Sequence, residues 1–293
     1  MRILITGTSG LLAAAIAREL RLEHEVCGLD LVPGEQTTHL GSVTNRELVF
    51  ELARGGDAII HTASLHAAHL QTHSPAQFID TNIHGTLNLL DAAAAHGIRR
   101  FVYTSTTSLY GHALERADQA VWVTEELVPQ PRDIYDITKI AAEQLCAAAA
   151  RQPPELTCMS LRVSRFFPED PRLLAIYRLY RGVDVRDAAA AHLLALETPL
   201  AGYDAFNISA HSPFGKDQLH RLKFGAAAVL RAQFPWIDEA FQRRAWELPA
   251  SIDRVYVTEK AERVLRYQPK FGLVQFLQEF PEIEARQRAG LLF

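Results

Sequence analysis

The chain has 293 residues, of which 48 % are hydrophobic and 22 % are charged, and its formal net charge at pH 7 is −4. This composition is ordinary for a globular protein and excludes disordered, collagen-like and coiled-coil chains. The chain has no excess of basic residues that could neutralise the phosphates of a nucleic acid, so we expect no nucleic acid partner.

Short apolar runs alternate with longer helical patterns through the first two thirds of the chain. Runs that are apolar on both faces predict buried strands of a parallel sheet, and the Ala- and Leu-rich segments between them predict helices. Strand, helix, strand in repetition implies right-handed crossovers and a doubly wound sheet. In chain order we predict strand 2–6, helix 11–20, strand 25–29, helix 45–54, strand 58–62, helix 76–96, strand 101–105, helix 133–151 and strand 156–163.

The pattern loosens after Pro153, where we predict only helix 188–197, strand 205–208 and helix 258–265. The fold class is therefore α/β, a Rossmann-type doubly wound parallel sheet with a small C-terminal substrate-binding region. We expect residues 1–165 to form the NAD-binding domain, with 184–209 returning to its sheet, and residues 166–183 and 210–293 to form the substrate-binding region.

A glycine turn follows the first strand and opens directly into a helix, which is the context of a dinucleotide site. Gly7 permits the tight turn, and Gly10 lets backbone N–H groups approach a pyrophosphate. The second strand ends in Asp30, whose carboxylate can accept hydrogen bonds from both ribose hydroxyls and would repel a 2′-phosphate. These residues predict NAD, rather than NADP, as the cofactor.

Tyr135 and Lys139 lie four residues apart on one face of a predicted helix. A tyrosine has an ordinary pKa of about 10, and a nearby lysine should lower that pKa toward the range of a general base. Thr106, just past strand 101–105, adds a hydroxyl that can hold the substrate oxygen. Any surface helix can carry such a pair, so it is the preceding dinucleotide turn that favours the catalytic interpretation.

With these motifs the chain resembles the extended short-chain dehydrogenase/reductase family, in particular its NAD-dependent sugar epimerase/dehydratase group. The resemblance covers nearly the whole length. It is carried by the glycine turn 6–10, the strand end 60–64, the segments 82–86 and 103–111, the pair within 135–139, and the later segments 185–189, 206–208 and 267–270.

The resemblance implies that Tyr135 is the acid/base, that Lys139 binds the nicotinamide ribose, and that Thr106 is the hydroxyl partner. For Asn82 a packing role between strand and helix is an open alternative to a cofactor contact. The implied cofactor contacts are Gly7, Ser9, Gly10, Leu11, Leu12, Asp30, Ser42, Val43, Thr62, Ala63, Ser64, Asn82, Thr104, Tyr135, Lys139, Val163 and Ser164.

The sequence departs from the family pattern in two places. Ser42 stands where the family commonly has an Asp that grips the adenine, so we expect looser adenine binding. The stretch between Arg162 and Asp187 is shorter than in members that hold nucleotide-diphosphate sugars, which implies a small pocket like that of the compact uronate dehydrogenases. Its arginines suit carboxylate recognition, although a surface role stays open for each. The predicted substrate contacts are His66, Thr106, Thr107, Arg165 and Arg172.

Other signals point to no metal, no disulfide and no membrane. His66, His69 and His73 would share a helical face, but no cysteine or carboxylate joins them at ligand spacing. Three cysteines without paired spacing favour a reducing compartment. Since we find neither a signal peptide nor a membrane-spanning stretch, we expect a cytoplasmic protein. The cysteines are Cys27, Cys146 and Cys158.

We therefore predict an NAD-dependent oxidoreductase that transfers a hydride to or from a hydroxyl or carbonyl group of a sugar or sugar acid. Two alternatives stay open: an NAD-dependent sugar epimerase or dehydratase, and a non-catalytic NAD-binding sensor or scaffold. The resemblance also implies a homodimer formed through helices 76–96 and 133–151.

Overall fold

Seven parallel strands form one sheet in the computed structural model, which describes residues 1–152 and 155–288. Their order is β3-β2-β1-β4-β5-β7-β8, so the chain winds outward from β1 in both directions, and the predicted fold class is confirmed. A small parallel sheet pairs β6 with β9. The strands are β1 Arg2–Thr6, β2 Glu25–Asp30, β3 His39–Leu40, β4 Ala58–His61, β5 Arg100–Thr106, β6 Val121–Val123, β7 Thr157–Val163, β8 Tyr203–Ile208 and β9 Arg254–Tyr256.

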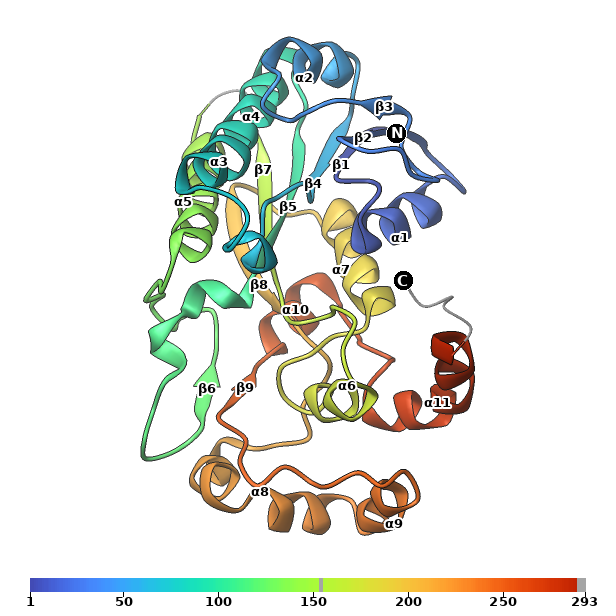
Figure 1. Ribbon diagram of the computed structural model, residues 1–293. Helices are drawn as coiled ribbons and strands as arrows, with labels where there is room; N and C mark the ends of the chain where they lie inside the picture. Colours follow the sequence, from blue (N-terminus) through green and yellow to red (C-terminus); the bar gives the residue numbers. More distant parts are fainter. Residues whose placement is uncertain (153–154, 289–293) are drawn as a thin grey trace.

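Helices cover both faces of the large sheet (Figure 1). The helices α1 (Leu11–Leu20) and α7 (Val185–Glu197) lie on one face, while α2 (Arg46–Ala53), α4 (Gly85–His96) and α5 (Ile134–Ala149) lie on the other. The remaining helices are α3 Pro75–Phe78, α6 Pro171–Tyr177, α8 Leu219–Gln233, α9 Ile237–Gln242, α10 Glu259–Leu265 and α11 Leu273–Arg288. No helix within the described residues is long and apolar enough to cross a membrane.

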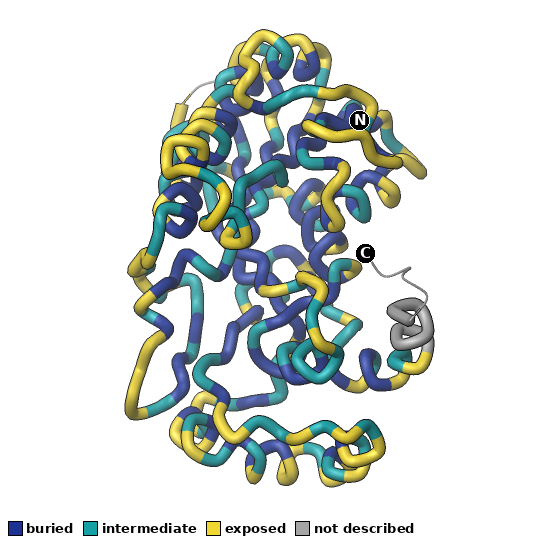
Figure 2. Tube along the Cα trace, viewed as in Figure 1, coloured by how far each residue is buried: buried dark blue, intermediate teal, exposed yellow. Residues whose placement is uncertain are grey.

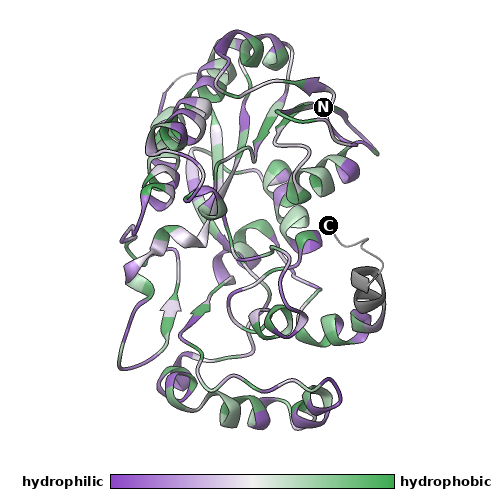
Figure 3. Cartoon of the chain, in the orientation of Figure 1, coloured by the Kyte–Doolittle hydropathy of each residue, from purple (hydrophilic) through white to green (hydrophobic). Residues whose placement is uncertain are grey.

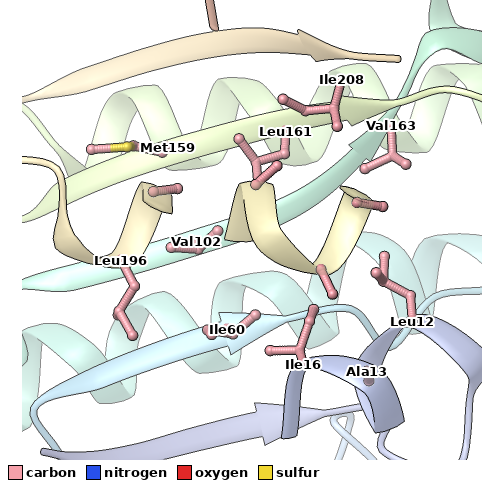
Figure 4. Close-up of a cluster of buried hydrophobic side chains, with 14 of the residues drawn as sticks. Leu12, Ala13, Ile16, Ile60, Val102, Met159, Leu161, Val163, Leu196 and Ile208 are labelled. Carbon is pink, nitrogen blue, oxygen red and sulfur yellow. The ribbon is translucent and has the colours of Figure 1, made fainter. Parts of the chain in front are cut away.

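Alternation of side chains along the strands explains why the sheet has a core on each face. On the face of α1, the side chains of Ile16, Ile60 and Val102 belong to one buried cluster, part of which is drawn in Figure 4. The outer helices carry hydrophobic and hydrophilic residues on different sides (Figure 3), which leaves the sheet as the buried centre of the molecule (Figure 2). A separate core joins α6, α8, α9, α11 and β9.

Most of the predicted elements are confirmed, and α1 matches to the residue. The predicted helix 76–96 is wrong in its middle, because Ile79–His84 form a π-helical segment between α3 and α4. No element was predicted for β3, β6, β9, α6, α8, α9 or α11. The three missed strands have only two or three residues each, too few to show a period.

Candidate active site

The glycine turn is built so that only glycine fits at its start. Gly7 has a φ of +77°, and a Cβ there would lie 2.7 Å from Thr62 Oγ1 and 2.9 Å from the backbone nitrogen of Ala63. Gly10 is the N-cap of α1 and provides no side-chain cap, so the first backbone N–H groups of the helix remain available to an anion. The turn therefore leaves backbone N–H donors available at the position where the sequence analysis expects a pyrophosphate.

Asp30 lies against the same turn. Its carboxylate accepts hydrogen bonds from the backbone N–H of Ser9 at 2.9 Å and of Val32 at 3.2 Å. Two backbone donors hold the side chain at the carboxyl end of β2, where a ribose would meet it. Leu11, the first residue of α1, is 53 % exposed.

The residues predicted to flank an adenine behave differently from each other. Val43 is buried and packs on Gly85, where a Cβ would come within 2.6 Å of Val43 Cγ2. Ser42 is half-buried, and its hydroxyl lies 2.7 Å from that of Thr44. Val43 is thus part of the core beneath the predicted adenine site, whereas the hydroxyl of Ser42 contacts a residue of its own loop.

Asn82 ties the loop after β4 to the helix α5. Its amide donates to Leu65 O at 2.8 Å and to Thr138 Oγ1 at 3.0 Å, and its carbonyl oxygen accepts from Leu65 N and from Ser64 Oγ. The side chain is 1 % exposed. These contacts favour the packing role that the sequence left open over a direct cofactor contact.

Thr106, Tyr135 and Lys139 are brought together at the carboxyl end of β5. Tyr135 lies in the first turn of α5, and the side chain of Thr106 lies near enough to its phenol to lower the pKa of Tyr135. Lys139, one turn later, donates to the backbone carbonyl oxygen of Thr104 at 2.7 Å and stands 4.3 Å from the centre of the Tyr103 ring. All three groups come from elements whose positions are fixed by the sheet.

The pKa of Tyr135 differs from the prediction. Burial raises the pKa of Tyr135 to about 12, and the hydrogen bond with Thr106 opposes that rise. Burial also lowers the pKa of Lys139 to about 7, against the attraction of Glu143. The predicted lowering of the tyrosine pKa by lysine is therefore wrong for the protein alone, because burial outweighs charge and the ammonium faces Thr104.

A buried ion pair that the sequence analysis missed joins α5 to β7. Arg162 Nη2 donates to Glu143 at 2.7 Å, and the hydroxyl of Ser105 donates to the same carboxylate at 2.6 Å. Arg162 also donates to the Tyr110 hydroxyl at 3.0 Å. The signals were present, since Glu143 follows Lys139 by one turn and Arg162 interrupts an apolar strand.

Thr104 has a second partner, His192 of α7, which the sequence analysis also missed. Their Oγ1 and Nε2 atoms are 2.8 Å apart, and His192 Nδ1 lies 2.7 Å from Ala188 O. Burial lowers the pKa of His192 to about 4, so the ring is neutral near pH 7. A neutral ring that donates from Nδ1 to the carbonyl oxygen accepts at Nε2 from the Thr104 hydroxyl.

The cofactor contacts predicted at the end of β7 are buried. Val163 packs in the core on the α1 side of the sheet (Figure 4). Ser164 is 2 % exposed, and its hydroxyl donates to Ser209 Oγ at 3.2 Å. Val163 is the last residue of β7, which pairs with β5, and Ser164 follows it toward the predicted substrate residues.

The residues predicted to contact a substrate are spread around this end of the sheet. Thr107 is buried directly after Thr106, and the half-buried His66 stacks on Phe167. Arg165 forms an ion pair with Glu169. Arg172 lies half-buried at the start of α6.

Two further arginines of the same stretch have different surroundings. Arg178 is buried and pairs with Asp184 at 3.0 Å, which makes it a structural residue. The guanidinium of Arg181 stands 4.8 Å from the centre of the Tyr177 ring.

A cavity of about 450 Å³ lies at the opposite end of the sheet. Its walls include Arg100 and Thr157, which begin β5 and β7, and Gly202, which precedes β8. None of the predicted site residues lines it. Ligands of doubly wound sheets bind beyond the carboxyl ends of the strands, so this cavity is on the wrong side for the predicted chemistry.

Comparison with known proteins supports the resemblance. The NAD dependent epimerase/dehydratase family matches residues 3–172. A 3-beta-hydroxysteroid dehydrogenase of Mycolicibacterium neoaurum is 33 % identical over 56 % of this chain and 47 % of its own length. A GDP-6-deoxy-D-mannose reductase of Pseudomonas aeruginosa is 35 % identical over 50 % of this chain and 46 % of its own. The chain spans about half the length of these curated relatives.

Solved structures share the fold over nearly the whole chain. A short-chain dehydrogenase/reductase superfamily protein from Agrobacterium tumefaciens with bound NAD has a TM-score of 0.74 and 23 % identity, and covers 99 % of both chains. A mutated uronate dehydrogenase has a TM-score of 0.65 and 18 % identity, and covers 97 % of this chain and 86 % of its own.

The family match covers more than half of the chain and includes the glycine turn, Asp30 and the pair Tyr135 and Lys139. The predicted family is thus confirmed, and the predicted cofactor is the one that the family's description names. The chain belongs to the NAD dependent epimerase/dehydratase family.

Proposed function

We propose that this protein is an NAD-dependent oxidoreductase that moves a hydride to or from a hydroxyl or carbonyl carbon of a sugar or sugar acid. The observation that carries the proposal is the placement of the Thr106 and Tyr135 hydroxyl groups at the carboxyl end of β5, one helical turn before Lys139, which donates to Thr104 O at 2.7 Å. A sensor or scaffold would need the glycine turn but not this pair of hydroxyl groups.

Each of the three residues has its own role in the proposed reaction. Thr106 holds the substrate oxygen, and Tyr135 takes the hydroxyl proton during oxidation or returns it during reduction. Lys139 orients the ribose, since its ammonium lies beside β5 and is fixed by Thr104 O. The nicotinamide ring, when bound, supplies the hydride acceptor or donor. The glycine turn and Asp30 hold the other half of the dinucleotide.

The site residues named from the sequence form one arrangement in this proposal. Gly7, Gly10 and the start of α1 receive the pyrophosphate, and Asp30 receives the adenosine ribose. Ser42, Ala63 and Ser164 line the path of the cofactor through their backbone. Thr107, Arg165 and Arg172 lie toward the substrate.

We also propose the domain division, residues 1–165 with 184–209 as the cofactor domain and residues 166–183 with 210–293 as the substrate-binding region. The separate core of α6, α8, α9 and β9 supports this division. The three cysteines are buried free thiols, which supports a reducing compartment such as the cytoplasm.

A homodimer through α4 and α5 is a further part of the proposal. These helices stand side by side at one edge of the molecule (Figure 1), and their outer faces carry exposed apolar side chains. Leu87 is 40 % and Ile137 is 48 % exposed. A second copy that buries these residues would remove that apolar surface from water.

Mixing the protein with NAD and a panel of hexoses, hexuronic acids and nucleotide sugars tests the proposed reaction. An oxidoreductase accumulates NADH in proportion to product, whereas an epimerase converts its sugar with no net change in absorbance at the NADH band. Failure of every compound to change chemically, in a protein shown to bind NAD, would contradict the proposed activity.

A further inference from the structure

A row of aromatic rings crosses from the loop after β7 to the loop after β4. Phe166 stacks on Phe167 with ring centres 4.9 Å apart, and Phe167 stacks on His66 at 5.1 Å with planes inclined by 22°. His66 then meets His69 edge to face at 4.3 Å. The histidine run noted in the sequence is therefore part of an aromatic contact between two loops that are far apart in the chain.

The strand order places this contact over the reacting groups. The strand β5 lies between β4 and β7, and all three are parallel, so a bridge between the loops after β4 and β7 passes across the carboxyl end of β5. Thr106 is the last residue of β5. Lys139 also lies at this end of β5, since it donates to Thr104 O, and its charge contributes to the lowered pKa of His66.

Each half of the bridge is held by its own surroundings. The backbone N–H of His66 donates to His69 Nδ1 at 3.0 Å, and the N–H of His69 donates to His66 O at 2.7 Å. On the other side, Phe166 packs against the core beside α1 and supports the ring of Phe167. Phe167 is 38 % exposed, so its outer edge meets solvent while its face lies on His66.

We propose that His66 and Phe167 form a cover over the substrate position and limit the substrate to a single unsubstituted sugar ring. The inference rests on the proposed function, since it names the substrate class of the same site. The two stacked rings join the loops after β4 and β7, and this bridge would block a glycosidic or nucleotide substituent from extending across the carboxyl end of β5.

The test compares the wild type with Phe167→Ala and His66→Ala. Phenyl glycosides and UDP-glucose serve as substituted probes, and free glucose and glucuronic acid as unsubstituted ones. Both NADH formation and thermal stabilisation in the presence of NAD are measured. Phe224→Ala is the matched control, because Phe224 is a 61 % exposed aromatic residue on α8.

We expect each cover variant to favour substituted over unsubstituted probes at least about ten-fold more than the wild type does. The control should keep the wild-type ratio, and all proteins should bind NAD equally. The proposed cover would be contradicted if the ratio of substituted to unsubstituted probes stayed unchanged in both variants, or if the wild type already preferred UDP-glucose.

The two readouts separate the cover from the proposed reaction. If no probe is oxidised but the stabilisation ratio changes in both variants, the cover stands and the proposed reaction fails. If the wild type oxidises free sugars and the ratio of substituted to unsubstituted probes is the same in both variants, the proposed reaction is supported and the proposed cover is contradicted. If no probe binds to any of the proteins, both are contradicted.

Discussion

The phenol of Tyr135 is a weak acid in water, and its position in the fold makes it weaker. Burial raises its pKa to about 12, and Asp136 and Asp133 add to that rise, while the Thr106 hydrogen bond opposes it. The spacing of Tyr135 and Lys139 predicted their shared face, but spacing contains no information on burial. For that reason the proximity of these two residues could be predicted from the sequence and the direction of the tyrosine pKa could not.

Thr106→Val removes the group that lowers this pKa. Oxidation requires Tyr135 to accept the substrate proton, so its rate rises with pH as the phenol ionises. In the variant this rise should move to higher pH, and Thr106→Ser should restore the original profile. The measurement is the pH dependence of kcat/KM for oxidation, and an unchanged profile in Thr106→Val would contradict the role given to the hydroxyl.

At the scale of elements, the sequence predicted what is periodic and missed what depends on tertiary contacts. The strands and helices of the sheet have clean apolar patterns, whereas β6 and β9 exist because they pair with each other across more than one hundred residues. The π-helical segment also depends on tertiary contacts, since Asn82 within it hydrogen bonds with both Leu65 and Thr138. No local sequence pattern predicts a contact with residues so far away in the chain.

The pair of Glu143 and Arg162 joins α5 to β7 in the interior. The side chains are 3 % and 10 % exposed, so removing one charge leaves the other buried without compensation. We expect Glu143→Gln to lower the free energy of unfolding by about 3–5 kcal/mol, as measured by denaturant titration.

The matched control is Glu239→Gln. Glu239 pairs with Arg243 at the surface, where both side chains are mostly exposed. Exposed pairs contribute at most about 1 kcal/mol, so this variant should unfold almost as the wild type does. Equal losses in the two variants would show that burial does not set the strength of the inner pair.

At the scale of the whole molecule, exposed apolar residues lie on the helices of the proposed homodimer. Ile79, the first residue of the π-helical segment, is 37 % exposed, and Leu87 of α4 is 40 % exposed. Ile137 lies on the neighbouring α5. This grouping is the surface that a second copy would cover in the proposed homodimer.

A charge on this surface should separate the subunits. We expect Leu87→Asp and Ile137→Asp to sediment as monomers at concentrations where the wild type is a dimer. Leu22→Asp is the control, because Leu22 is 78 % exposed next to α1, away from this surface. A wild type that sediments as a monomer, or a dimer that persists in both variants, would contradict the proposed interface.

The most direct test of the account is Tyr135→Phe, which removes one oxygen atom from the site and little else. The variant should bind NAD within about two-fold of the wild type, while kcat for sugar oxidation falls by about 10²- to 10⁴-fold. Fluorescence titration gives the affinity, and NADH formation gives the rate. Near-normal turnover in a variant that still binds NAD would contradict the central claim that the Tyr135 phenol moves the substrate proton.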